Sequence, residues 1–139
     1  MSDGEVLQIF GATVRAMRAH LDRVLKAHAL RLGQCQVLRV LWEADALTPR
    51  ELAQRLEVEM PTVTRTVQRM VRDGLVSREP HSHDARSVVI RLTERGRAVK
   101  TKIGGVLANE TEHALAGFSD EDRAVFVTAL KRMHENVRR

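Results

Sequence analysis

Apolar positions in the first quarter of the chain repeat with the period of a helix that packs along another helix. They recur at alternating spacings of three and four residues within about Glu5 to Ala29: Leu7, Phe10, Val14, Met17, Leu21 and Val24, with His28 at the next seam position. This alternation is an a/d heptad seam and predicts one long helix. A seam of this regularity indicates a partner helix, in the same chain or in a second copy.

Two shorter helices are predicted next. Leu32-Gly33 breaks the first pattern, and a mostly apolar segment from about Gln34 to Glu43 predicts a second helix. Thr48-Pro49-Arg50-Glu51 predicts the start of a third helix, which extends to about Leu56. This start combines a threonine cap, a proline at the first helical position and a glutamate that closes a capping box.

A fourth helix follows after a turn of four residues, Glu57 to Met60. Pro61 is predicted at its first position, where a missing N–H has no cost, and the helix extends to Asp73. Gly74 ends it as the residue beyond the C-cap. Its apolar residues are expected in the core: Val63, Val67, Met70 and Val71.

A β-hairpin is predicted after this helix. The runs Leu75–Glu79 and Ser87–Leu92 are rich in β-branched residues, and the polar segment Pro80–Arg86 joins them. The tip is too long for a two-residue turn. Thr93 then starts a further long helix, and Ser119 caps a last one.

The order of elements predicts a mainly α fold with a small β-hairpin wing, a winged helix-turn-helix flanked by dimerisation helices. We expect a single domain over residues 1–139. Its DNA-binding lobe covers about 33–93, and a helical dimerisation region covers about 5–29 and 94–138. A monomer of this size has difficulty covering three apolar stripes, which favours a homodimer.

The basic residues are concentrated where this lobe would meet DNA. Between Pro61 and Lys102 there are ten Arg or Lys and four Asp or Glu, an excess of +6. The rest of the chain has a net charge of −1, which gives +5 overall. Such a local excess is typical of phosphate neutralisation, although a solvated basic face is the plainer alternative.

Five sequence blocks carry a resemblance to a known family. They are Leu47–Ala53, Pro61–Arg65, Asp73–Val76, Asp84–Ser87 and Leu92–Gly96. In order and spacing they resemble the MarR family (multiple antibiotic resistance regulators), bacterial and archaeal winged-helix dimers. The resemblance covers nearly the whole chain. It implies a regulator that binds double-stranded DNA at a pseudo-palindromic operator, most often a repressor that occludes a promoter.

The helix from Pro61 to Asp73 is expected in the major groove. Side chains near the N-terminus of such a helix meet base edges, which selects Thr62, Thr64 and Arg65. Arg65 can bind guanine or a phosphate, and only the first gives sequence specificity. Arg69 and Arg72 lie on the same side of this helix and are expected to contact phosphates or to pair with acids.

The resemblance implies that Arg86, at the hairpin tip, enters the minor groove, whose negative potential attracts arginine. Asp84 is expected to brace the wing by pairing with an arginine or by accepting backbone N–H groups. An ordinary turn is the alternative for this motif. Further phosphate candidates are Arg78, His81, Ser82 and His83.

The resemblance also implies a pocket for a small aromatic or phenolic effector that weakens DNA binding. Candidate lining residues are Met17, His20, Val24, Trp42 and residues near Val106, although plain core is the commoner role for each of them. Cys35 is the only cysteine and begins the second helix, so two hypotheses stay open: a redox sensor with a lowered thiol pKa, or a buried structural thiol. The six histidines show no closed metal site, and no cofactor is expected.

Other classes of protein are disfavoured. The chain has no Gly-rich phosphate loop, HExxH, GxSxG or nucleophilic Cys/His signature, so we expect a regulator and not an enzyme. No apolar run reaches the roughly 20 residues that a membrane helix needs, and we expect a cytoplasmic protein. A winged helix that binds proteins is the remaining alternative.

Overall fold

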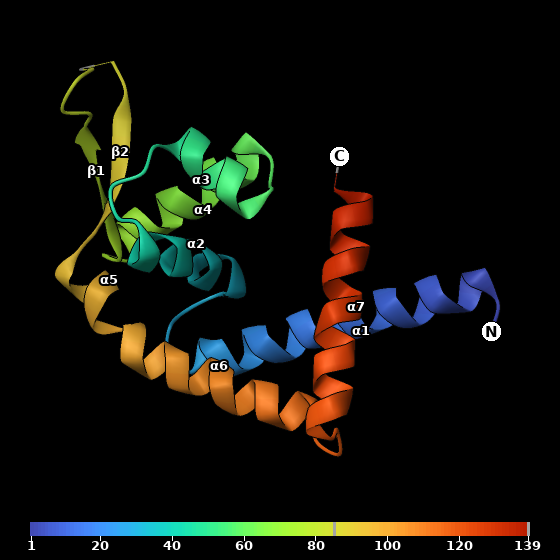
Figure 1. Ribbon diagram of the computed structural model, residues 1–139. Coiled ribbons are helices and arrows are strands. Elements are labelled where there is room, and N and C mark those ends of the chain that lie inside the picture. Colours follow the sequence, from blue (N-terminus) through green and yellow to red (C-terminus); the bar gives the residue numbers. More distant parts are fainter. Residues whose placement is uncertain (85, 139) are drawn as a thin grey trace. The chain divides into compact units, whose positions relative to one another are not determined.

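The structure, a computed structural model, describes residues 1–84 and 86–138 (Figure 1). Its elements follow in this order: α1 Asp3–Lys26, α2 Leu32–Glu43, α3 Pro49–Leu56, α4 Met60–Arg72, β1 Val76–Pro80, β2 Val88–Leu92, α5 Glu94–Ala98, α6 Lys100–Ala114 and α7 Asp120–Val137. The predicted mainly α fold with a β-hairpin wing is confirmed. Ala85 and Arg139 lie outside the described residues.

The chain divides into two compact units, one from Met1 to Ile103 and one from Gly104 onward. The first unit holds α1, the helix-turn-helix and the wing, whereas the second holds most of α6 and all of α7. The predicted grouping of 5–29 with 94–138 concerns a dimer and stays a prediction.

Reciprocal capping begins three of the helices. Thr48 accepts a hydrogen bond from the Glu51 backbone N–H (3.1 Å), and the Glu51 carboxylate accepts one from the Thr48 N–H (3.1 Å). These bonds lower the pKa of Glu51. Ser2 caps α1 and Ser119 caps α7 in the same way, so α1 begins at Asp3, two residues before the predicted start.

Several predicted boundaries are wrong by one to three residues. Leu32 and Gly33 belong to α2, because Arg31 takes the N-cap position. α4 begins at Met60 with Pro61 as its second residue. The helix after the hairpin is interrupted at Val99, whose ψ of −7° departs from the helical value of about −42°.

The core of the first unit joins α1, α2, α3, α4, the hairpin and α6. Its largest fully buried side chains are Leu25, Leu38, Leu41, Leu52, Met70, Leu75, Ile90, Ile103, Val37, Val63 and Val76. Val71 was predicted in this core, but it is 38% exposed. Val71 lies four residues after Val67, at the edge of the buried face of α4, so its burial depends on which neighbouring elements reach that edge.

The hairpin is antiparallel, with Val76 opposite Leu92 and Pro80 opposite Val88 (Figure 1). Leu47 joins its inner edge through two backbone hydrogen bonds with Ile90, of 3.2 and 2.7 Å. On the exposed face, the Arg91 side chain lies 2.7 Å from the Glu79 carboxylate. The base of the wing is thereby fixed to the helical lobe.

Candidate nucleic-acid interface

α4 has one buried face and one exposed cationic face. Val63, Val67 and Met70 are at most 2% exposed, at spacings of four and three residues. Arg65, Arg69 and Arg72 have the same spacings and are exposed. Because α4 turns 100° per residue, these arginines form a stripe opposite the core. The stripe is therefore available to a partner.

The N-terminal end of α4 presents the two threonines predicted to meet bases. Thr62 and Thr64 are exposed there, one turn or less from Arg65. The turn before α4 depends on Glu57, which adopts the left-handed conformation (φ 56°) and caps α3 through its N–H. This turn places α4 beside α3 and completes the helix-turn-helix.

The wing tip is closed by hydrogen bonds to the Asp84 carboxylate and by two backbone hydrogen bonds. Asp84 accepts from the Arg86 backbone N–H (3.0 Å) and from the Ser87 hydroxyl (3.2 Å). The Asp84 carbonyl accepts from the Ser87 N–H (3.0 Å), and the His81 N–H donates to the Ser87 carbonyl (2.9 Å). Arg86 is exposed beside this turn. The middle residue of the motif, Ala85, lies outside the described residues.

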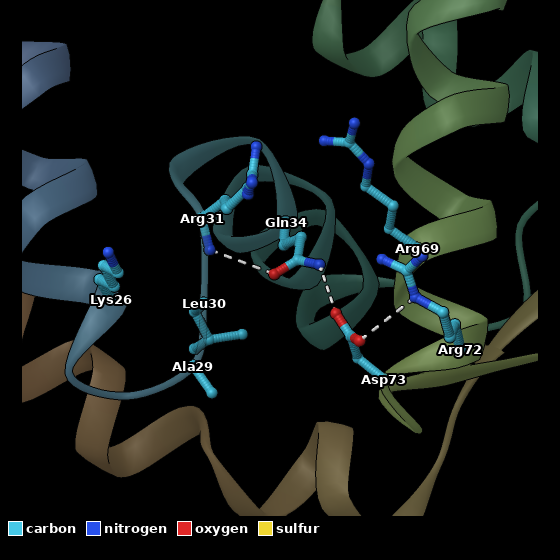
Figure 2. Close-up of a pocket in the computed structure, with 8 residues that line it drawn as sticks. All are labelled: Lys26, Ala29, Leu30, Arg31, Gln34, Arg69, Arg72 and Asp73. Carbon is cyan, nitrogen blue, oxygen red and sulfur yellow. Dashed lines mark hydrogen bonds and ion pairs between the residues drawn. The ribbon is translucent and has the colours of Figure 1, made fainter.

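A basic cavity that the sequence did not reveal lies between α2 and the end of α4 (Figure 2). Its volume is about 310 Å³, and its lining residues are Lys26, Ala29, Leu30, Arg31, Gln34, Arg69, Arg72 and Asp73. Gln34, 4% exposed, accepts from the Arg31 N–H (3.1 Å) and donates to Asp73 (3.0 Å). Gln34 was predicted near the start of this helix, but its partner 39 residues away follows from tertiary packing alone.

The residues predicted around an effector have varied surroundings. Met17 is 36% exposed on α1, and Val24 is half-buried. The Trp42 indole N–H donates to the Gly96 carbonyl (2.9 Å), which joins α2 to α5. His20 is half-buried on α1. The hydrogen bond of Trp42 gives this residue a structural role, and the effector pocket remains a prediction.

Cys35 is buried, with 3% of its surface exposed. Burial, together with the nearby Asp22 carboxylate, raises the pKa of its thiol to about 11. Of the two hypotheses for Cys35, the structure agrees with the buried structural thiol, because Cys35 occupies the fourth position of α2, inside the core. A thiol in this state is a poor nucleophile at neutral pH.

In residues 1–84 and 86–138, no helix is long and apolar enough to cross a membrane. The same residues contain no group of three or more His, Cys, Asp or Glu side chains that could hold a metal ion.

The exposed arginine stripe, the helix-turn-helix and the braced wing together define the class of winged helix-turn-helix DNA-binding regulators. The MarR family model matches residues 30–88, which cover α2, α3, α4 and most of the hairpin. The chain is 30% identical over 128 residues to the organic hydroperoxide resistance transcriptional regulator of Bacillus subtilis, covering 89% of this chain and 86% of that protein. This protein belongs to the MarR family.

Another relative and a solved structure are similar to this protein over most of the chain. The transcriptional repressor YetL of Bacillus subtilis is 29% identical over 125 residues, covering 88% of this chain and 75% of YetL. The structure of a MarR protein from Peptoclostridium difficile superposes with a TM-score of 0.89 at 26% identity, covering 99% of this chain and 90% of that one. MarR proteins are DNA-binding transcriptional regulators and not enzymes, which confirms the predicted class.

Proposed function

We propose that this protein is a cytoplasmic homodimeric repressor that binds a pseudo-palindromic operator and is released by a small-molecule effector. The observation that carries the proposal is the stripe formed by Arg65, Arg69 and Arg72 on α4, opposite the buried face. The YetL relative, named a transcriptional repressor, supports the repressor assignment. Occupancy of a promoter by such a dimer would exclude the polymerase.

Base recognition is assigned to Thr62, Thr64 and Arg65. A bidentate arginine–guanine contact discriminates against a wrong base by about 1–3 kcal/mol, whereas a phosphate contact does not discriminate. Arg86 is assigned to the minor groove, since the hydrogen bonds of Asp84 hold the backbone beside it. Arg69 and Arg72 are assigned to the phosphate backbone.

The exposed apolar side chains support the homodimer. On α1 they include Val6, Leu7, Ile9 and Phe10, and on α7 they include Val125, Phe126, Val127, Leu130 and Val137. Apolar surface of this extent on two helices marks an interaction site. A two-fold dimer would place two α4 helices about 34–36 Å apart, one turn of B-DNA.

The effector is assigned only by chemistry. A small aromatic or phenolic molecule would weaken DNA binding if it preferred the conformation that does not fit the operator. Met17, His20, Val24 and Trp42 are its proposed neighbours. Thiol sensing through Cys35 is not favoured, because burial raises the pKa of this thiol.

A matched pair of variants tests the dimeric repressor. Leu130→Asp places a charge on the apolar stripe of α7, and Lys131→Asp changes the charge of the next residue, about 100° around the helix. Sedimentation should show a dimer for wild type and Lys131→Asp and a monomer for Leu130→Asp. In a reporter assay, Leu130→Asp should lose repression and Lys131→Asp should keep it. A monomeric wild type that represses fully would contradict the proposal.

A further inference from the structure

The basic cavity between α2 and α4 has more positive charge than its own carboxylate can neutralise. Lys26, Arg31, Arg69 and Arg72 contribute four cationic side chains, and Asp73 contributes one carboxylate. Among the described residues, Lys26, Arg31 and Arg69 form no ion pair. The cavity therefore has the composition of an anion-binding site.

The Asp73 carboxylate, the one carboxylate among the lining residues, is held by Gln34 and Arg72 (Figure 2). One Asp73 oxygen accepts from the buried Gln34 amide (3.0 Å), and the other lies 3.8 Å from the Arg72 Nε. The Arg31 and Arg69 side chains extend in the same direction from facing elements. Neither of these two arginines pairs with Asp73, whose ion pair is with Arg72.

The position of the cavity on α4 indicates which anion it takes. Arg69 and Arg72 continue the stripe that begins at Arg65, about 6 and 10 Å further along the axis at 1.5 Å per residue. The 13 residues of α4 extend about 20 Å, whereas the major groove is about 12 Å wide. If the N-terminal end lies in the groove, the C-terminal turns lie over its phosphate edge.

We infer that this cavity is a phosphate-binding site that holds one backbone phosphate at the edge of the groove read by α4. Lys26, from the end of α1, and Arg31, from the N-cap of α2, are thereby added to the DNA interface. The site fixes the position of α4 on the duplex and carries no sequence information. The inference rests on the proposed function, since it needs α4 to lie in the groove.

The test compares wild type with the double variant Lys26→Gln/Arg31→Gln, and with both single variants. Arg18→Gln, an exposed arginine two turns before Lys26 on α1, is the matched control. Affinity for operator and for scrambled duplex is measured by fluorescence anisotropy from 50 to 400 mM salt. Circular dichroism melting confirms that each variant is folded, and the single variants serve if the double variant does not fold.

One phosphate contact changes the slope of log affinity against log salt by about 0.9. The double variant should lose about 0.9 from the slope and bind about eightfold more weakly at 0.1 M salt. Its preference for operator over scrambled DNA should be unchanged, as should every property of Arg18→Gln. A wild-type slope in the double variant would overturn the inference while leaving the proposed function intact.

Inorganic phosphate distinguishes a free anion from the DNA backbone. It replaces chloride at constant ionic strength, and the inference predicts no saturable loss of DNA binding at millimolar phosphate. A rise in the melting temperature of wild type with phosphate that is absent in the double variant, together with equal DNA affinity and salt slope in the two proteins, would show a site for free phosphate alone and would overturn the inference. If wild type shows no salt-dependent DNA binding, both the proposed function and the inference fail.

Discussion

Gly96 permits the close approach of α5 to the end of α4, and Gly96→Ala should destabilise the protein. A Cβ on Gly96 would collide with the Leu75 backbone carbonyl and press against the Leu92 side chain. Because the backbone can move only with difficulty, the loss of unfolding free energy should be near the upper end of the range for overpacking, about 3 kcal/mol. Displacement of the Gly96 carbonyl would also weaken the Trp42 hydrogen bond, at about 1 kcal/mol.

The higher helix propensity of alanine offsets about 1 kcal/mol of this cost. The net expected loss of unfolding free energy is therefore about 3 kcal/mol, and the melting temperature should fall by about 12 °C. Urea denaturation followed by circular dichroism and Trp42 fluorescence measures it, at equal protein concentration because a dimer makes stability depend on concentration.

Gly4→Ala is the control, since open space surrounds Gly4 in the first turn of α1. It should change the unfolding free energy by less than about 1 kcal/mol. If Gly96→Ala were as stable as wild type, the contact of Gly96 with Leu75 would not determine how α5 packs, and the reasoning would be refuted.

Three further predictions concern local groups. At pH 8 iodoacetamide should alkylate Cys35 about 100-fold more slowly in the native protein than in denaturant, and equal rates would contradict the burial of this thiol. The stability that comes from its raised pKa should be lost as the pH rises from about 9 to about 11. Asp84→Ala should weaken operator binding several-fold, because the bond to the Arg86 N–H is lost, and the affinity of Asp84→Asn should be intermediate. The melting temperature of Asp84→Ala should be nearly unchanged. Wild-type affinity in Asp84→Ala would show that the wing tip needs no bracing. Thr48→Ala should cost about 1 kcal/mol in urea denaturation. Because the Thr48 hydrogen bonds lower the pKa of Glu51, this difference should shrink as the pH falls below the ordinary pKa of a glutamate. A constant difference would argue against the capping box.

Local patterns in the sequence were sufficient to predict the order of elements. The Thr48 capping box, Pro61 and Gly74 each act on residues within a few positions, so sequence reasoning located the helix-turn-helix to within a residue. The exposure of Val71 and the interruption at Val99 depend on how the helix meets its neighbours. Boundaries and burial were wrong at these two residues for that reason.

The candidate site was predictable to the extent that it lies on one element. The Arg65, Arg69 and Arg72 stripe follows from helical spacing alone, although its DNA contacts remain predictions. The basic cavity was missed because Lys26 and Arg31 come near α4 only through the packing of α1 and α2. The sequence held no signal for it, since the burial of Gln34 and its bond to Asp73 arise only when the elements pack.

The most direct test of the account is the affinity of the purified protein for its own upstream region against scrambled DNA at several salt concentrations, with Arg65→Ala and Arg86→Ala. The account predicts tight binding to the upstream fragment that weakens steeply with salt. It also predicts that Arg65→Ala loses the preference for that fragment and that Arg86→Ala loses affinity. Equal, weak binding of wild type to both DNAs, unchanged in the two variants, would contradict it.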